Sequence, residues 1–175
     1  VDSFLLNACQ SYEQGMELIE RGAIAGIVTL SDVVNDGAVD IGRSLARLLN
    51  YGFPIRPSLE IASRDTYVGS DYIVVGDGSF HVTQVQGALP NMCRISRSGD
   101  SYRVDYRTYP VGEYGLGSLV RPILGDDVSH YLSSGTADGF EMTESELEDF
   151  LDLEEIPVIV DRQLVWSGSL DVDSI

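Results

Sequence analysis

The 175-residue chain contains no lysine, and all eleven of its basic residues are arginine. Without lysine it can form neither a phosphate-binding loop of the usual type nor a Schiff base with a substrate. Its longest apolar run, residues 23–30, is far shorter than the roughly 20 residues of a membrane-spanning helix. Two cysteines, Cys9 and Cys93, are too few for a disulfide framework or a zinc site. We therefore expect no membrane span and no structural metal.

Positive charge is also scarce, because 28 acidic residues give the chain a net charge of −17. Fourteen of these acids, against two arginines, lie in residues 121–175. Such a surface is not expected to attract nucleic acid or anionic membranes. Arginine without lysine in an acidic chain indicates either a GC-rich genome or adaptation to high salt. No basic start followed by an apolar run marks a signal peptide, so a cytoplasmic or virion location is expected.

The apolar pattern predicts an α+β protein with helices first. Residues 11–21 are expected to form a helix that begins at Ser11 and ends at Gly22, and residues 39–51 form a second helix that ends before Gly52. A shorter helix could begin at Ser31. Residues 23–34 remain undecided between helix and strand, because short length and β-branching argue in opposite directions. Residues 1–57 would form this helical unit, and residues 58–175 a β-rich body.

Period-two patterns separated by glycine turns predict the β-rich body. It would be a mostly antiparallel sheet, a sandwich or a small barrel. After it, residues 126–132 could form a short helix, and Thr143 and Glu146 form a capping box that begins an acidic helix over residues 143–153. Residues 158–166 would form a closing hairpin, and the acidic tail 171–175 is expected to be loose. The predicted strands of the body are residues 59–62, 67–75, 80–85, 92–97, 102–109 and 118–124.

Residues 91–110 predict a β-hairpin closed on Gly99 and Asp100, which suit a two-residue type II′ turn. This register places Arg94 opposite Asp105 on one face and leaves the other face apolar. In so acidic a protein, a row of arginines is well suited to a protein–protein contact. The expected core face carries Cys93, Ile95, Val104 and Tyr106, and the candidate interface residues are Arg94, Arg97, Arg103 and Arg107.

The segment Thr29–Phe53 resembles the helix-turn-helix of winged-helix regulators, in which a short helix, a tight turn at Asn35-Asp36-Gly37 and a longer helix precede a wing. The resemblance implies a recognition helix that carries Arg43 and Arg47, with Arg56 at the start of the wing. The same segment also carries three aspartates and lacks a cluster of phosphate-binding groups. This charge argument favours a plain helical hairpin over a DNA-binding motif.

Few residues are candidates for metal binding or catalysis. Asp126, Asp127 and His130 have a spacing that could bind a divalent metal on one helical face, but no further ligand is identified and capping of a helix start by the aspartates is favoured. No nucleophile–base pair, cofactor motif or nucleotide-binding motif is present, so no cofactor is expected. The sequence favours a non-enzymatic structural protein that self-associates into a homo-oligomer or a larger particle, such as the virion of a virus of a halophilic or high-GC host. The alternatives are a winged-helix-like regulator and, third, a metal-dependent enzyme.

Overall fold

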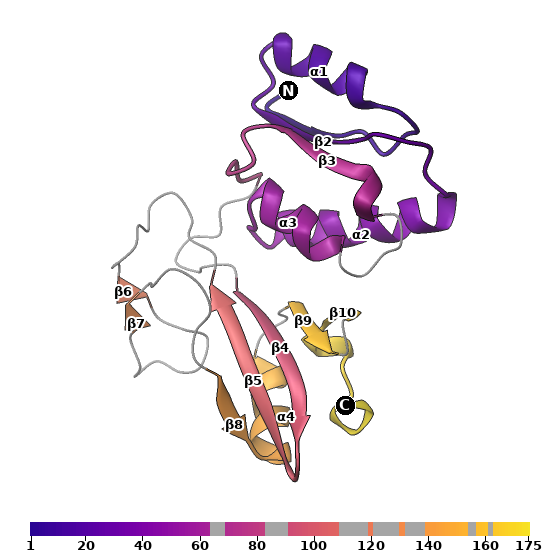
Figure 1. Ribbon diagram of the computed structural model, residues 1–175. Coiled ribbons are helices and arrows are strands. Elements are labelled where there is room, and N and C mark those ends of the chain that lie inside the picture. The colour runs from indigo at the N-terminus through magenta and orange to yellow at the C-terminus, as the bar shows by residue number, and fades with distance from the viewer. Residues whose placement is uncertain are drawn as a thin grey trace. The chain divides into compact units, whose positions relative to one another are not determined.

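The computed structural model describes residues 1–63, 69–82, 91–108, 119–120, 130–131, 139–153, 157–160 and 163–175 (Figure 1). The chain divides into two compact units, Val1–Val85 and Gln86–Ile175. The predicted α+β class is confirmed, because most of the helices come first and the described strands form open sheets rather than a closed barrel. The first unit extends past residue 57, where the helical unit was predicted to end, and that position lies inside helix α3 (Ile55–Ala62).

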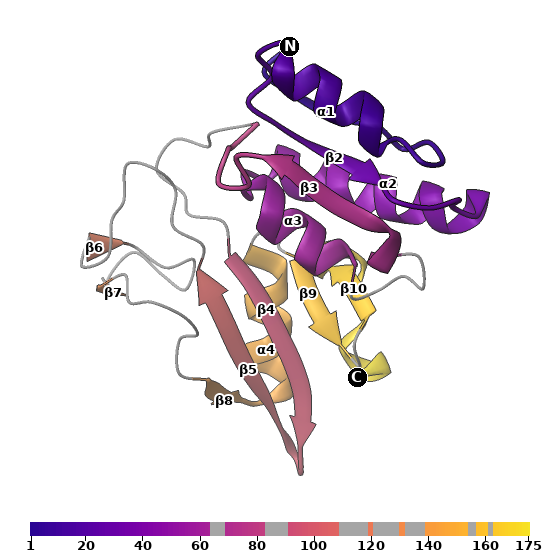
Figure 2. The ribbon, with the colours of Figure 1, turned by 45° about the horizontal axis from the view of Figure 1, so that its top comes forward.

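The first unit is a three-stranded sheet between helices. Its strand order is β1 (Ser3–Leu5), β2 (Ala25–Thr29), β3 (Tyr72–Gly76), with β1 parallel and β3 antiparallel to β2. Helix α1 (Tyr12–Glu20) connects the parallel strands and covers one face. Helices α2 (Asn35–Asn50) and α3 cover the other face, as Figures 1 and 2 show.

The segment that the sequence left undecided contains the central strand β2. All five residues of β2 are buried, because the strand is covered on both faces. Five residues form little more than one helical turn, whereas β-branched Ile27, Val28 and Thr29 suit a strand. The helix predicted to begin at Ser31 is wrong, since residues 31–34 are not helical and α2 begins at Asn35.

The predicted ends of α1 and α2 are confirmed, and both use the same glycine geometry. Gly22 and Gly52 have φ values of +101° and +102°, a conformation that favours glycine. At the second of these ends, the Gly52 N–H donates to the Leu49 carbonyl and the Phe53 N–H donates to the Leu48 carbonyl. This is a Schellman motif, which satisfies the last carbonyl groups of the helix.

Helix α3 corrects a sequence prediction, because residues 59–62 were expected to form a strand. Pro54 and Pro57 in the sequence favour an end to helical structure, yet proline is tolerated in the first turn of a helix. The free amides of that turn are also satisfied. The N–H groups of Ile55 and Arg56 donate to the carbonyls of Phe80 and Gly78, at 3.1 and 2.9 Å.

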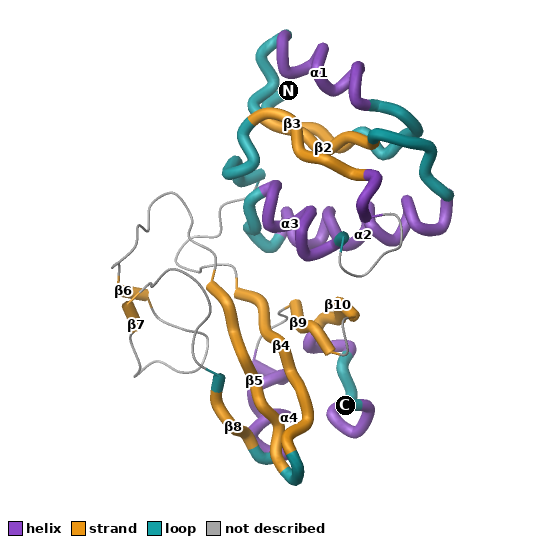
Figure 3. The backbone as a smooth tube through the Cα atoms, viewed as in Figure 1, coloured by secondary structure: helices purple, strands orange, loops and turns teal. Residues whose placement is uncertain are grey.

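The second unit is built on a five-stranded sheet whose centre is the predicted hairpin. The hairpin is confirmed with its register, which pairs Ile95 with Val104 and Arg94 with Asp105. Gly99 at the turn has a φ of +65°. Figure 3 shows its two long strands running side by side to this turn. The strand order is β10 (Gln163–Trp166), β9 (Pro157–Val160), β4 (Asn91–Ser98), β5 (Ser101–Thr108) and β8 (Phe140–Met142).

Helix α4 (Glu144–Leu153) supplies the second layer of this unit and begins at the predicted capping box. The Glu146 carboxylate accepts hydrogen bonds from the Thr143 N–H and hydroxyl, both at 2.8 Å. These two bonds, the backbone bond first, lower the pKa of Glu146. Their stabilising contribution is therefore present above the ordinary glutamate pKa and is lost as the pH falls through the lowered value. Leu147, Phe150 and Leu151 form the buried side of α4, as predicted.

The remaining elements are short. Strands β6 (Leu119–Val120) and β7 (His130–Tyr131) pair antiparallel, so the helix predicted over residues 126–132 is wrong at its last described positions. The predicted closing hairpin is present as β9 and β10. The tail is not loose among residues 171–175, because its residue Val172 is buried. The 3-10 turns are η1 (Gly69–Asp71), η2 (Ser167–Ser169) and η3 (Val172–Ser174).

The patterns at residues 67–75 and 80–85 predicted two strands. Only part of the first predicted strand is a strand: residues 69–71 form η1 and β3 begins at Tyr72, while residues 67–68 lie outside the described part of the chain. In the second, the described residues 80–82 form no strand, and His81 makes only an isolated bridge to Pro54. Residues 83–85 lie outside the described part of the chain.

Candidate functional site

The hairpin arginines divide between the two faces of the five-stranded sheet. Side chains alternate along a strand, so Arg94 shares a face with its cross-strand neighbour Asp105 and with Arg103. Glu141 on β8 pairs with Arg103 in the register and joins the same face. We call the five residues Arg94, Ser96, Arg103, Asp105 and Glu141 the arginine face.

One predicted interface residue does not belong to the arginine face. Arg97 pairs with Tyr102, and its guanidinium carbon lies 5.7 Å from the centre of the Tyr102 ring. Tyr102 is buried on the core face, so Arg97 caps the edge of the core by a cation–π contact. Arg107 has the register position of the arginine face, opposite Met92, and its side chain lies outside the described part.

The ion pair of the arginine face joins different residues from those expected. The Arg103 Nε lies 3.0 Å from the Asp105 Oδ1, so Asp105 binds Arg103 along the strand and not Arg94 across it. Both side chains are partly exposed, and such a pair contributes at most about 1 kcal/mol. Arg94 is exposed and has no ion pair with any residue that the structure describes.

Gly139 leaves room for the Arg103–Asp105 pair. It continues strand β8 opposite Asp105, and a Cβ at this position would overlap the Asp105 carboxylate and approach the Arg103 guanidinium to 2.9 Å. Across the sheet, the Ser101 hydroxyl donates to the Glu141 Oε2 at 2.6 Å. Two carboxylates of the arginine face therefore have partners on the same face, whereas Arg94 has no ion pair with a residue in the described ranges.

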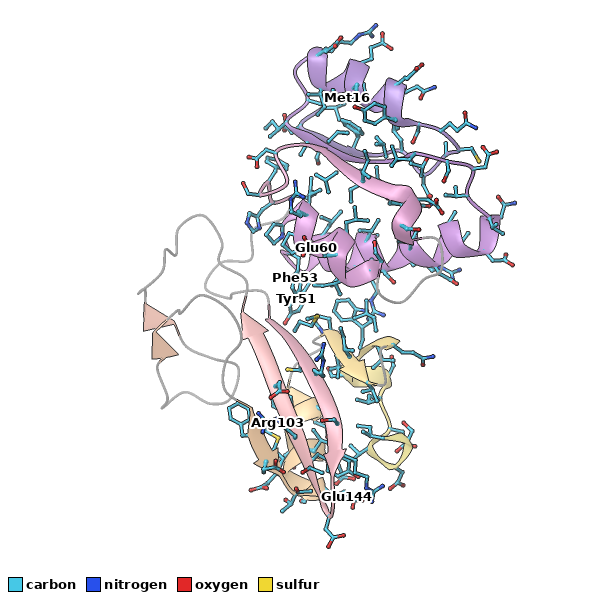
Figure 4. The ribbon with its side chains drawn as sticks, in the orientation of Figure 1. Met16, Tyr51, Phe53, Glu60, Arg103 and Glu144 are labelled. Carbon is cyan, nitrogen blue, oxygen red and sulfur yellow. The ribbon has the colours of Figure 1, made fainter. Side chains whose placement is uncertain are left out.

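Helix α4 carries the opposite charge on the opposite side of the sheet. Its buried side packs against the core face of the hairpin, which carries Ile95 and Val104. Both ribbon views show α4 on one side of β4 and β5, and Figure 4 labels Arg103 on β5 and Glu144 at the start of α4. The outward side of α4 exposes the carboxylates of Glu144, Glu146, Glu148, Asp149 and Asp152.

The residues of the regulator resemblance do not form a helix-turn-helix. Thr29 ends strand β2, and the predicted turn at residues 35–37 is the first turn of α2. Arg43 and Arg47 are both exposed on α2, as the resemblance requires, but Asp36 and Asp40 are exposed on the same helix. Arg56 lies in the first turn of α3 rather than at the start of a wing.

The metal candidates are not brought together by the described structure. His130 lies in strand β7 and not on a helix, which removes the helical spacing that motivated the site. Asp126 and Asp127 lie outside the described residues. Among the residues that are described, no three His, Cys, Asp or Glu side chains are placed to hold a metal ion together.

A polar cluster that the sequence interpretation missed lies at the carboxyl ends of the parallel strands β1 and β2. In open α/β sheets this edge is where ligands usually bind. The buried hydroxyl of Ser11 donates to the Leu6 carbonyl at 3.0 Å and accepts from the Thr29 N–H at 3.0 Å. The Thr29 hydroxyl donates to the Ala8 carbonyl. Ser11 is the N-cap of α1 as predicted, but its hydroxyl fixes the loop to β2 instead of capping the helix.

Two further side chains complete this cluster. The Tyr72 hydroxyl donates to the Asn7 Oδ1, and the Asn7 Nδ2 donates to the Ala38 carbonyl at 2.7 Å. Burial, followed by the negative charges of Asp71 and Cys9, raises the pKa of Tyr72. The phenol therefore stays protonated and remains a donor to Asn7. The signal in the sequence was a polar loop between a short apolar segment and a helix start.

Cys9 is the exposed nucleophilic group at this edge. It precedes Gln10, whose φ of +51° makes it the one non-glycine residue with positive φ in the described part of the chain. Gln10 is held there by two bonds, from its N–H to the Ser31 carbonyl and from its Nε2 to the Asp32 Oδ1, both at 3.1 Å. A backbone strained in this way is often found at functional sites.

Comparisons of the chain with protein-family models, with curated proteins and with solved structures find no match. Within the described ranges, no helix combines the length and the apolar character that a bilayer span requires.

Proposed function

We propose that this protein is a structural subunit that self-associates through the arginine face of its five-stranded sheet. The observation that carries the proposal is Arg94, which is exposed on a sheet face away from α4 and has no ion pair among the described residues. Arginine is enriched at protein–protein contacts because its guanidinium is weakly hydrated and binds carboxylates bidentately.

The composition supports an assembly in a salt-rich or high-GC setting. A chain with 28 acidic residues and no lysine keeps its surface hydrated at high ionic strength. The proposed role is a component of a homo-oligomer or larger particle, such as a capsid or tail, in the virion or the cytoplasm. No catalytic step is assigned to the arginine face, since it carries no nucleophile–base pair.

Size-exclusion chromatography with light scattering tests this proposal. At about 0.15 M salt, charges farther apart than about 8 Å are screened while charges in contact still attract. We expect a mass above the 19.1 kDa of one chain under this condition, rising with protein concentration. A single-chain mass at every salt and concentration would exclude the proposal.

The cluster at the ends of β1 and β2 favours a second candidate function, a thiol-dependent activity with Cys9 as the nucleophile. Cys9 lies exposed between the carboxyl end of a parallel strand and the start of α1, beside a strained residue. A nucleophilic thiol also needs a base within hydrogen-bond reach. The two histidines do not identify this base. His81 bonds through its Nδ1 to the Gly52 carbonyl at 2.9 Å, and the side chain of His130 is not described.

The two cysteines provide an internal comparison for this candidate. Burial raises the pKa of Cys93 to about 12, so its thiolate is absent at neutral pH. We expect iodoacetamide to modify Cys9 in the folded protein and Cys93 only after unfolding, as measured by peptide mass spectrometry. The second candidate further requires Cys9 to react faster than free cysteine at the same pH. An equal or lower rate would exclude an activated thiol, and Cys9→Ser should abolish labelling of the folded chain.

A further inference from the structure

We propose that the partner of the arginine face is the outward side of α4 on a second copy of this chain. The inference rests on the proposed self-association and adds the surface that completes it. Within one unit, α4 packs by Leu147, Phe150 and Leu151 on the core face of the sheet. Its exposed carboxylates therefore point away from the sheet, on the side opposite Arg94 and Arg103.

Charge complementarity favours the outward side of α4 as the partner surface. The outward side of α4 carries Glu148, Asp149 and Asp152, which are exposed and have no ion pair among the described residues. Arg94 is the matching cation, since no residue in the described part of the chain forms an ion pair with it, and Arg103 is half-exposed beside it. One copy cannot bring these groups together, because the sheet itself separates them. A second copy can, when its α4 lies across the arginine face of the first.

The geometry of this contact has a consequence for assembly. The two surfaces are different, so each copy offers one arginine face and one α4, and the contact is head-to-tail. Repetition of a head-to-tail contact gives a ring if the rotation closes and a filament if it does not. A variant chain that keeps only one of the two surfaces should bind one neighbouring chain and then block the addition of further chains.

A mixing experiment tests this arrangement on the full chain at about 0.15 M salt. The first variant is Arg94→Glu, which reverses the arginine face and keeps α4. The second is Glu148→Gln with Asp149→Asn, which neutralises these two positions of α4, keeps the arginine face and gives the reversed face of the first variant no new partner. We expect each variant alone to have the mass of one chain, and association to weaken more than about tenfold. The equimolar mixture should form a species of two chains and no larger one.

Matched controls keep the result interpretable. Arg43→Glu changes an exposed arginine of α2 by the same charge, and Glu13→Gln with Glu60→Gln removes two charges, like the double variant, at exposed positions of α1 and α3. Both controls should assemble like the unchanged chain, and all variants should show its circular dichroism. If the unchanged chain associates and both surface variants still do, another surface makes the contact and this inference is wrong. If the unchanged chain never associates, the proposed function itself is wrong.

Discussion

Replacing Ile95 by alanine is expected to lower the free energy of unfolding of the second unit by about 2–5 kcal/mol. Ile95 is 2% exposed and faces Val104, which is fully buried, at the centre of the five-stranded sheet. The loss combines the transfer free energy of the removed methyl and methylene groups with the cavity they leave, because a sheet centre cannot collapse freely. Urea unfolding followed by tryptophan fluorescence measures it, since the single tryptophan, Trp166, is buried in this unit.

Ser96→Ala is the matched control for this prediction. Ser96 directly follows Ile95 in β4 and is exposed on the opposite face, so its truncation should change stability by less than about 0.5 kcal/mol. Equal unfolding midpoints for Ile95→Ala and Ser96→Ala would contradict the assignment of the core face.

Gly15→Ala is expected to destabilise the first unit, although alanine is the better helix former by about 1 kcal/mol. Gly15 is buried in the middle of α1, and a Cβ there would overlap the Val28 Cγ1 and approach the Phe4 ring to 3.4 Å. Overpacking of this kind typically costs about 1–3 kcal/mol, which outweighs the gain in helix propensity. Loss of the helical circular dichroism signal during urea unfolding measures the effect.

The cause can be isolated with a second substitution. Val28→Ala removes the Cγ1 atom that the new Cβ would meet. In that background Gly15→Ala should become stabilising, because the space is free and only the helix propensity remains. If Gly15→Ala has the same effect in both backgrounds, the contact between α1 and β2 is not the reason for the glycine.

Local chemistry made several elements predictable from the sequence. The register of the β4–β5 hairpin follows from a two-residue turn and from side-chain alternation, and both are properties of adjacent residues. The start of α4 follows from Thr143 and Glu146, and the ends of α1 and α2 follow from Gly22 and Gly52. Each of these signals is contained within a few residues and needs no knowledge of the rest of the fold.

The sequence left elements undecided, or assigned them wrongly, where distant residues decide the outcome. Strand β2 is a strand because β1 and β3 flank it and helices cover both of its faces, which no short window can reveal. Helix α3 begins between Pro54 and Pro57, because the carbonyls of residues 78 and 80 accept hydrogen bonds from its first N–H groups. Both outcomes are tertiary effects that override local preference.

The candidate site was predictable only in part. Alternation alone should have assigned Arg97 to the face of Ile95, because the two positions differ by two residues. The Arg103–Asp105 pair could not be foreseen, because it depends on Gly139 leaving room on the next strand. The cluster around Ser11 and Thr29 depends on the parallel pairing of β1 with β2, which brings the loop at residues 6–11 to the end of β2.

The pairing of β4 with β9 sets an order in which the two units can become complete during synthesis. The sheet of the first unit uses strands that end at Gly76, so all of its strand pairs exist once that residue has emerged. Strand β9 pairs Val158 with Cys93, and the core beneath α4 also needs Val172. The second unit therefore cannot close until Val172 has been made, and the long sequence separation between β4 and β9 makes that closure slow. Until then the apolar hairpin face and the edge of β4 stay open to other chains.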